Sequence, residues 1–347
     1  MTDIFPISLL FSILLIFISK TFGKKGIVNI RKSPQTLHTK SISRFGGIAI
    51  FFSLLLVSFI DSSENYRFMR MALYCSSPIF TLGILDDFQV EIKPFVKLLI
   101  VLPSAFLSYY FLGVEAYSLD IPYIDSLFEF KIVSVFFICF AIAGMVNAFN
   151  MIDGINGLVL LYSLTICVLI LLFQSSSSSP EINLFFVAIF FAILAVFVLN
   201  FPFRIIFLGD GGAYFLGIML SIGVIKYYQI NGLSPWYVFS VFIYPTTDVF
   251  FSIIRRIIAK VSAVKPDSKH LHHIVYKRVK KIGLESENTN HVITTLLIFI
   301  LYFPFLLSAN YFANNSLILQ IQCLIFASFY LAFYVLLAPK DLTYRKT

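Results

Sequence analysis

The amino-acid sequence predicts an all-α polytopic membrane protein with about eleven transmembrane helices. Of its 347 residues, 59% are hydrophobic and only 13% are charged, and the mean hydropathy is +0.90. Apolar stretches long enough to cross a hydrocarbon core of about 30 Å recur from one end of the chain to the other. They leave no room for a soluble domain, so we expect residues 1–347 to form one integral membrane domain.

Each expected span is an apolar run bounded by polar or turn-forming residues. The runs cover residues 4–21, 45–60, 68–85, 95–113, 131–149, 156–173, 182–200, 205–226, 235–258, 291–308 and 316–338. The first run continues into a basic loop without a small-residue cleavage site, so we expect it to be kept as a membrane helix.

The positions of lysine and arginine predict the orientation, because basic residues beside membrane spans stay in the cytoplasm. With a periplasmic N-terminus and a cytoplasmic C-terminus, all but four of the 26 basic residues are cytoplasmic, and the exceptions are Arg67, Arg70, Lys131 and Lys226. The net charge of +8 then reflects topology and contact with anionic membrane lipid. It predicts no nucleic-acid partner.

Five groups of polar residues stand at the ends of these spans. Asp86 and Asp87 follow the third span, residues 147–156 follow the fifth, Asn200 and Arg204 follow the seventh, Asp210 begins the eighth, and residues 269–273 follow the ninth. The alternation of spans puts all five on the cytoplasmic side. Because unpaired polar groups are costly at a membrane boundary, the pattern predicts one composite site there.

The acidic residues indicate a hard divalent cation. Asp86 and Asp87 could form an ordinary helix end in the interface, but adjacent half-desolvated carboxylates repel each other unless a cation lies nearby. Mg²⁺ is usually held by one or two carboxylates together with substrate phosphates. Asp210 is surrounded by Gly209, Gly211 and Gly212, which we expect to let backbone amides approach a phosphate and the carboxylate reach a metal.

Two basic loops complete the predicted site. Residues 266–273 contain three of the five histidines of the chain, His270, His272 and His273, and a solvated loop explains the lysines but not these imidazoles. Zinc is disfavoured because no cysteine lies nearby. In residues 34–47, His38, Lys40 and Arg44 are mainly a topology signal, and a share of them is expected to clamp anionic phosphates.

These motifs together resemble the polyprenyl-phosphate N-acetylhexosamine-1-phosphate transferases, glycosyltransferase family 4. Four motifs match in order: the loop at 38–47, the Asp86-Asp87 pair, the asparagine-rich block at 147–158 and the Gly209-Asp210 block. The His-Leu-His-His segment at 270–273 resembles the branch that uses UDP-N-acetylhexosamine, whereas pentapeptide transferases of this family have three consecutive histidines. The matches span residues 34–273.

The resemblance implies transfer of N-acetylhexosamine-1-phosphate from a UDP-sugar to undecaprenyl phosphate, which releases UMP, in a bacterial inner membrane. It implies Mg²⁺, with Mn²⁺ as an alternative, and products that begin O-antigen, capsule or related glycans. It leaves open whether the protein is a homodimer. The implied catalytic residues are Asp86, Asp87, Asp153 and His270, the metal ligands Asp210 and Asp87, and the substrate contacts His38, Arg44, Asn147, Asn150, Asn156, Asn200, His272 and His273.

One departure and two mechanisms stay open. Asn156 stands where many family members have aspartate, although an amide can also read a uracil edge. The acceptor phosphate can displace UMP directly, with Asp86 or Asp87 orienting or deprotonating it, or the reaction can pass through a phospho-aspartate.

The main alternative from another class is a secondary transporter, since acidic residues and glycine-broken helices also mark transporters. Transporters place their coupling sites near the membrane midplane, whereas these acids stand at span ends. The acidic motif of the CDP-alcohol phosphotransferases is absent, and a structural scaffold does not explain the clustering on one side.

Overall fold

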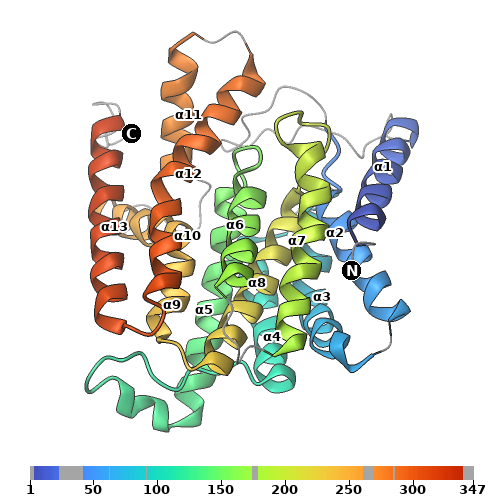
Figure 1. Cartoon of the computed structure of the whole chain (residues 1–347). Helices are drawn as coiled ribbons and strands as arrows, with labels where there is room; N and C mark the ends of the chain where they lie inside the picture. Colours follow the sequence, from blue (N-terminus) through green and yellow to red (C-terminus); the bar gives the residue numbers. More distant parts are fainter. Residues whose placement is uncertain are drawn as a thin grey trace.

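The chain folds into a bundle of helices. The structure is a computed structural model that describes residues 4–22, 42–61, 63–90, 92–173, 179–260, 267, 269–283 and 286–338, and every regular element within these ranges is helical. Most of the long helices run side by side, with α8 inside the bundle and α1 and α13 at its edges (Figure 1). The prediction of an all-α polytopic membrane protein is confirmed.

The helical boundaries follow the apolar runs closely. The α-helices are α1 (Ile4–Phe22), α2 (Gly46–Ile60), α3 (Arg67–Asp87), α4 (Pro94–Leu112), α5 (Lys131–Ile152), α6 (Leu158–Leu172), α7 (Pro180–Asn200), α8 (Gly209–Asn231), α9 (Pro235–Val241), α10 (Ile243–Ile258), α11 (Leu271–Lys281), α12 (Glu287–Tyr311) and α13 (Ser316–Leu337). Short 3₁₀ helices, η2 (Glu64–Tyr66) and η3 (Asp125–Glu129), precede α3 and α5.

Seven helices of the described residues are long and apolar enough to cross a membrane, and the pair α9 and α10 together would make an eighth. Helices α1, α2 and α6 are apolar but shorter. The expected total of eleven spans and the periplasmic N-terminus therefore stay predictions. The run expected at 235–258 forms two helices instead of one, because the chain bends by 81° between α9 and α10.

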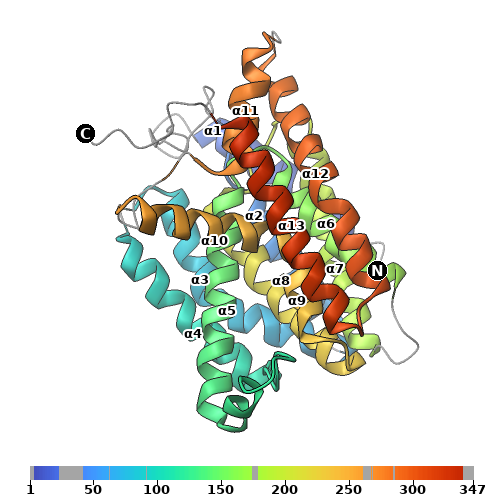
Figure 2. The ribbon, with the colours of Figure 1, turned by 90° about the vertical axis from the view of Figure 1, so that its left-hand side faces the viewer.

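Two helices near the predicted site depart from the sequence analysis. Figure 2 shows α10 lying across the direction of α5 instead of continuing α9. Helix α11 forms where the sequence analysis predicted only a basic loop, and in Figure 1 it projects beyond the ends of α6 and α7. One face of α11 is apolar and buried, and this burial stabilises the helix. The residues of this face are Leu271, Ile274, Val275 and Val279.

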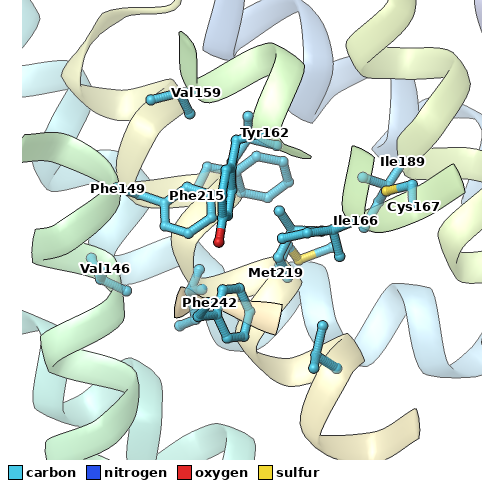
Figure 3. Close-up of a cluster of buried hydrophobic side chains, with 14 of the residues drawn as sticks. Val146, Phe149, Val159, Tyr162, Ile166, Cys167, Ile189, Phe215, Met219 and Phe242 are labelled. Atoms are coloured by element: carbon cyan, nitrogen blue, oxygen red, sulfur yellow. The ribbon is translucent and has the colours of Figure 1, made fainter. Parts of the chain in front are cut away.

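Helix α8 is the centre of the packing. Nearly all of its side chains are buried, and it contacts α2, α3, α5 and α7. Figure 3 shows the apolar core around it, where Phe215 and Met219 of α8 meet Phe149 of α5, Tyr162 of α6 and Phe242. Asn150 follows Phe149 on α5 and Asp210 stands in the first turn of α8, so the packing of these two helices positions both predicted site residues.

Close contacts between glycines set the distance of α8 from its neighbours. A Cβ added to Gly83 of α3 would lie 2.4 Å from Gly211 Cα, and one added to Gly47 of α2 would lie 2.2 Å from Gly212 Cα. Gly217 approaches the backbone of α5 in the same way, since a Cβ added there would lie 2.9 Å from Val146 Cα. The glycines after Asp210 thus serve helix packing, a role that we had not predicted for them.

Candidate active site

Asp87 joins the end of α3 to the beginning of α8. Its two carboxylate oxygens accept hydrogen bonds from the backbone N–H groups of Asp210 and Gly211, each at 2.9 Å. Gly209 has φ +82°, and a Cβ there would lie 2.7 Å from Asp87 Oδ2. Only glycine fits this turn. A carboxylate at the positive end of a helix is favourable, so Asp87 holds Asp210 in place whatever else it binds.

Asp86 is almost fully buried and forms an ion pair with Lys97 of α4. The Asp210 carboxylate is also within hydrogen-bonding range of Asp86. Lys97 was predicted only as one of the cytoplasmic basic residues, and its contact with Asp86 was not predicted. Its position ten residues after the aspartate pair was the only available signal, and lysines at membrane ends are too common for that signal to stand out.

Asp153 lies in the turn between α5 and α6, close enough to Asp210, Asp87 and Arg44 for their charges to act on its carboxylate. Burial raises the pKa of Asp153 well above its usual value, the charges of Asp210 and Asp87 add to this, and Arg44 opposes it. We call the four carboxylates the acidic cluster: Asp86, Asp87, Asp153 and Asp210. The structure brings all four predicted acids together.

Arg44 reaches the acidic cluster because its segment runs along the chain before α8. The Ser43 carbonyl accepts a hydrogen bond from Phe207 N–H, and Gly46 N–H donates to the Phe207 carbonyl, at 2.8 and 2.9 Å. The Arg44 guanidinium then lies 3.9 Å from Asp87 Oδ1. His38, the other substrate contact predicted in this loop, lies outside the described residues.

The first two asparagines of the block line α5 near the site. Asn150 donates a hydrogen bond to the hydroxyl of Tyr214, 3.2 Å away, and its own carbonyl oxygen is buried with no partner among the described residues. Tyr214 stands one turn after Asp210 on α8. Asn147 is half-buried and donates to the Ala143 carbonyl of its own helix. Asn150 is therefore held next to the acidic cluster with an acceptor free for a ligand.

Asn156 and Asn200 are connected mainly to the protein backbone. Asn156 Nδ2 donates to the Asn200 carbonyl at 3.2 Å, and Asn200 Nδ2 donates to the Ile206 carbonyl at 2.7 Å. The Asn156 backbone also binds His291 and Thr295 of α12. Both asparagines thus tie the turn after α5 to the end of α7, and the structure brings them to each other more than to the acids.

The three histidines form a buried group, the histidine cluster: His270, His272 and His273. Their ring centroids lie 4.4 to 6.1 Å apart, and no ring is more than 2% exposed. A Cβ added to Gly154 would lie 2.7 Å from His273 Cε1 and 3.5 Å from His272 Nε2. The histidine cluster therefore contacts the residue that follows Asp153.

Burial determines the charge of two of these histidines. It lowers the pKa of His272 to about 4, with the neighbouring His270 adding to the effect and Asp248 opposing it. Burial and the two other imidazoles lower the pKa of His273 well below its usual value. Both are neutral at pH 7, so they offer a ligand hydrogen bonds rather than charge.

Asp248 was not predicted as a site residue from the sequence. This fully buried aspartate of α10 contacts His270, Leu271 and Tyr330, which connects the histidine cluster to α13. A signal existed, because an acid inside an apolar stretch is a functional hypothesis by default. The stretch was counted as one membrane span, whereas the chain bends by 81° before α10, and Asp248 of α10 contacts His270.

The acidic cluster fits a divalent cation. Among the described residues, Arg44 and Lys97 are the cationic side chains that act on its four carboxylates, which leaves a negative surplus. Within this part of the chain no three His, Cys, Asp or Glu side chains are already arranged around one point. Mg²⁺ does not require this, because it binds through one or two carboxylates, phosphates and water.

A family model and several named relatives match this chain, and they agree with one another. The model of glycosyl transferase family 4 matches residues 69–228. A probable undecaprenyl-phosphate N-acetylglucosaminyl 1-phosphate transferase of Bacillus subtilis is 31% identical over 314 residues, 88% of this chain and 83% of the relative. The undecaprenyl-phosphate alpha-N-acetylglucosaminyl 1-phosphate transferases of Thermotoga maritima and Escherichia coli K12 are 29% and 27% identical over 78% and 80% of this chain, and 80% and 76% of their own lengths.

The fold and the site define a multi-pass membrane protein in which acids and histidines from distant helices meet at one end of the bundle. The family match and the coverage of the Bacillus subtilis relative go further. The chain belongs to glycosyl transferase family 4.

Proposed function

We propose that the protein transfers the sugar-1-phosphate group of a UDP-N-acetylhexosamine to undecaprenyl phosphate, giving undecaprenyl-diphosphate-sugar and UMP. The observation that carries this proposal is the meeting of the acidic and histidine clusters at Asp153 and Gly154. A carboxylate surface suits a metal-bound diphosphate, and buried imidazoles beside it suit the phosphate oxygens. The printed names of the relatives favour N-acetylglucosamine as the sugar.

Asp210, together with Asp87, would hold Mg²⁺, with Mn²⁺ as the alternative. The cation would neutralise the donor diphosphate and stabilise the charge that develops on UMP. Both oxygens of Asp87 already accept backbone hydrogen bonds, but each carboxylate oxygen keeps a second lone pair. Asn150, with its unpaired carbonyl oxygen, would face the donor nucleotide.

The arrangement supports direct displacement. An oxygen of the lipid phosphate would attack the sugar-linked phosphorus, and the bond to the bridging oxygen would break with its electron pair leaving on UMP. Asp86 is paired with Lys97 and Asp87 is doubly hydrogen-bonded, so neither carboxylate is a free nucleophile. Incubation with radiolabelled donor and no acceptor tests this step, and a phosphorylated protein would establish the covalent route instead.

The lipid acceptor can approach along α10. This helix leaves the direction of the bundle and exposes Phe250, Ile254, Ile257 and Ile258, while Asp248 on its buried side contacts the histidine cluster. An apolar surface beside the site suits a polyprenyl chain, and we place the protein in a bacterial inner membrane, where it would begin O-antigen, capsule or related glycan synthesis.

The proposal is tested with purified protein, undecaprenyl phosphate, Mg²⁺ and a panel of UDP-sugars, scored for UMP release. We expect release with UDP-N-acetylglucosamine that depends on both the lipid and the cation. Uptake of a substrate into sealed vesicles without UMP release would instead establish a transporter.

A further inference from the structure

His270 differs from the other two histidines because a carboxylate lies against it. Asp248 Oδ2 is 2.7 Å from His270 Nδ1, and both side chains are almost completely buried. His272 Nδ1 meets only the hydroxyl of Tyr244, at 3.2 Å, and His273 Nδ1 has no partner among the described residues. Asp248 therefore singles out one imidazole of the cluster.

The two oxygens of Asp248 have separate tasks. Oδ1 accepts hydrogen bonds from the Tyr330 hydroxyl at 2.6 Å and from the Leu271 backbone N–H at 3.3 Å. Oδ2 is left for His270 alone. Because an ionised carboxylate only accepts hydrogen bonds, Nδ1 of His270 carries a proton. The Oδ1 contacts fix the carboxylate between α10, α11 and α13, and the Oδ2 contact fixes the imidazole.

The other nitrogen of His270 lacks a protein partner. His270 Nε2 is buried and has no hydrogen bond within the described part of the chain. An unpaired buried nitrogen is costly, so it points to a ligand that is recognised there. The His270 ring stacks on His272, 5.6 Å away, and His272 and His273 contact Gly154 beside Asp153.

We propose that Asp248 is a positioning residue that makes His270 the cationic hydrogen-bond donor of the site, with Nδ1–H bonded to Asp248 and Nε2–H donated to a phosphate oxygen of the nucleotide. This rests on the proposed function. No proton leaves His270 in the transfer, and the imidazolium stabilises the charge that collects on the departing UMP phosphate. Charge-assisted hydrogen bonds are about twice as strong as neutral ones.

Asp248→Asn tests the proposal selectively. An asparagine keeps Oδ1 for Tyr330 and Leu271 but presents an amide N–H to His270 Nδ1, so the imidazole is left neutral while the structural contacts remain. We expect kcat to fall by about 10 to 100-fold and the KM for the UDP-sugar to change by less than about threefold.

The pH dependence separates positioning from a structural role. The charged and titratable groups around His270 are Asp248, Asp267, His272, His273, Tyr244 and Tyr330. Loss of the Asp248 charge disfavours the imidazolium, so the alkaline limb of the rate profile should move to lower pH and the defect should grow from pH 6 to pH 8. A defect equal at every pH, or wild-type kcat with an unshifted profile, would overturn the proposal.

Two further variants control for folding. Tyr330→Phe removes one Oδ1 contact and keeps the charge, so we expect a loss below about tenfold and no shift of the profile. Tyr237→Phe removes a comparable buried hydrogen bond, to Asn310 at 3.0 Å, at the opposite end of the bundle and should leave activity unchanged. A shift with either variant would contradict the assignment to Asp248.

A spectroscopic readout keeps the test independent of turnover. Nitrogen spectra of histidine-labelled protein at pH 7 should show one imidazole protonated on both nitrogens, absent in His270→Gln and neutral in Asp248→Asn. If no UDP-sugar releases UMP from the wild type, the proposed function fails, and these spectra still decide the charge of His270. A neutral His270 in the wild type would overturn the inference.

Discussion

The acidic and histidine clusters meet at one turn of the chain but are built in opposite ways. The acidic cluster stands at the ends of long helices that pack glycine to glycine, and its carboxylates outnumber the nearby cations. The histidine cluster stands on the short helix α11, is buried, and contains its own carboxylate partner in Asp248. The acidic cluster has more carboxylates than neighbouring cationic side chains, whereas in the histidine cluster His270 faces a carboxylate partner, Asp248.

This difference indicates how each half meets a substrate. A negative surplus on a rigid frame favours a ligand that arrives with a metal ion, since the ion relieves repulsion that already exists. The neutral imidazoles of His272 and His273, buried in the protein, offer directed hydrogen bonds with little reorganisation. The following variants test whether the two halves really differ in this respect.

Asp210→Asn should have the largest effect. It removes a carboxylate of the acidic cluster while its backbone N–H still binds Asp87, so we expect UMP release to fall by about 1,000-fold. The thermal midpoint without Mg²⁺ should not fall, because the variant lowers the repulsion that raises the pKa of Asp153. Full activity would remove the metal assignment, and Glu129→Gln at the exposed end of η3 is the matched control.

Lys97→Met should destabilise the acidic half. It leaves Asp86 buried without its cation, and breaking a buried ion pair costs about 3 kcal/mol of unfolding free energy. Adding Asp86→Asn should restore much of the stability but not the activity. Denaturant unfolding in detergent measures both. If Lys97→Met were no less stable than Lys93→Met, an exposed neighbour, the ion pair would have no structural importance.

Acid should destabilise the histidine half. The pKa of His272 is about 4 in the folded protein and about 6.5 when unfolded, so its neutral form stabilises the fold above pH 6.5 and this contribution is lost as the pH falls towards 4. The full loss is about 3 kcal/mol. Unfolding measured between pH 7.5 and 5 should show this slope, and His272→Gln should flatten it. Asp153 contributes to the pH dependence of stability with the opposite sign. Its pKa is raised in the folded protein, so protonation in acid stabilises the fold.

Gly154→Ala should have the smallest effect and act on the contact between the halves. The new methyl group would lie 2.7 Å from His273 Cε1, so the ring must shift and we expect about a tenfold loss of kcat. Overpacking would cost about 1 to 2 kcal/mol of stability. Gly144→Ala on α5, where a Cβ would meet nothing within 4 Å, is the control. Equal activity in the two variants would show that the halves act independently.

Much of the site was predictable because its residues stand at the ends of apolar spans, and the order of the spans tells which ends share a side of the membrane. Alternating spans place residues at every second boundary on the same side, and this was enough to group Asp86, Asp153, Asp210 and the histidines. The roles of Asn156 and Asn200 were harder, since an amide that binds a nucleotide and one that binds a backbone carbonyl look alike in sequence. Lys97 and Asp248 were missed because lysines at membrane ends are common and the bend that makes Asp248 a neighbour of His270 has no simple sequence signal.

The sequence by itself determined the class of the protein, the boundaries of most helices and the set of polar residues on one side, because hydrophobicity acts locally along the chain. Only the tertiary structure decided which charges are paired. Asp87 accepts hydrogen bonds from the first turn of α8, Asp86 forms an ion pair with Lys97, and Asp248 contacts His270. The partners are 11 to 123 residues apart in the sequence. Electrostatic energy depends on the distance between charges and on their burial, and neither quantity follows directly from the order of residues.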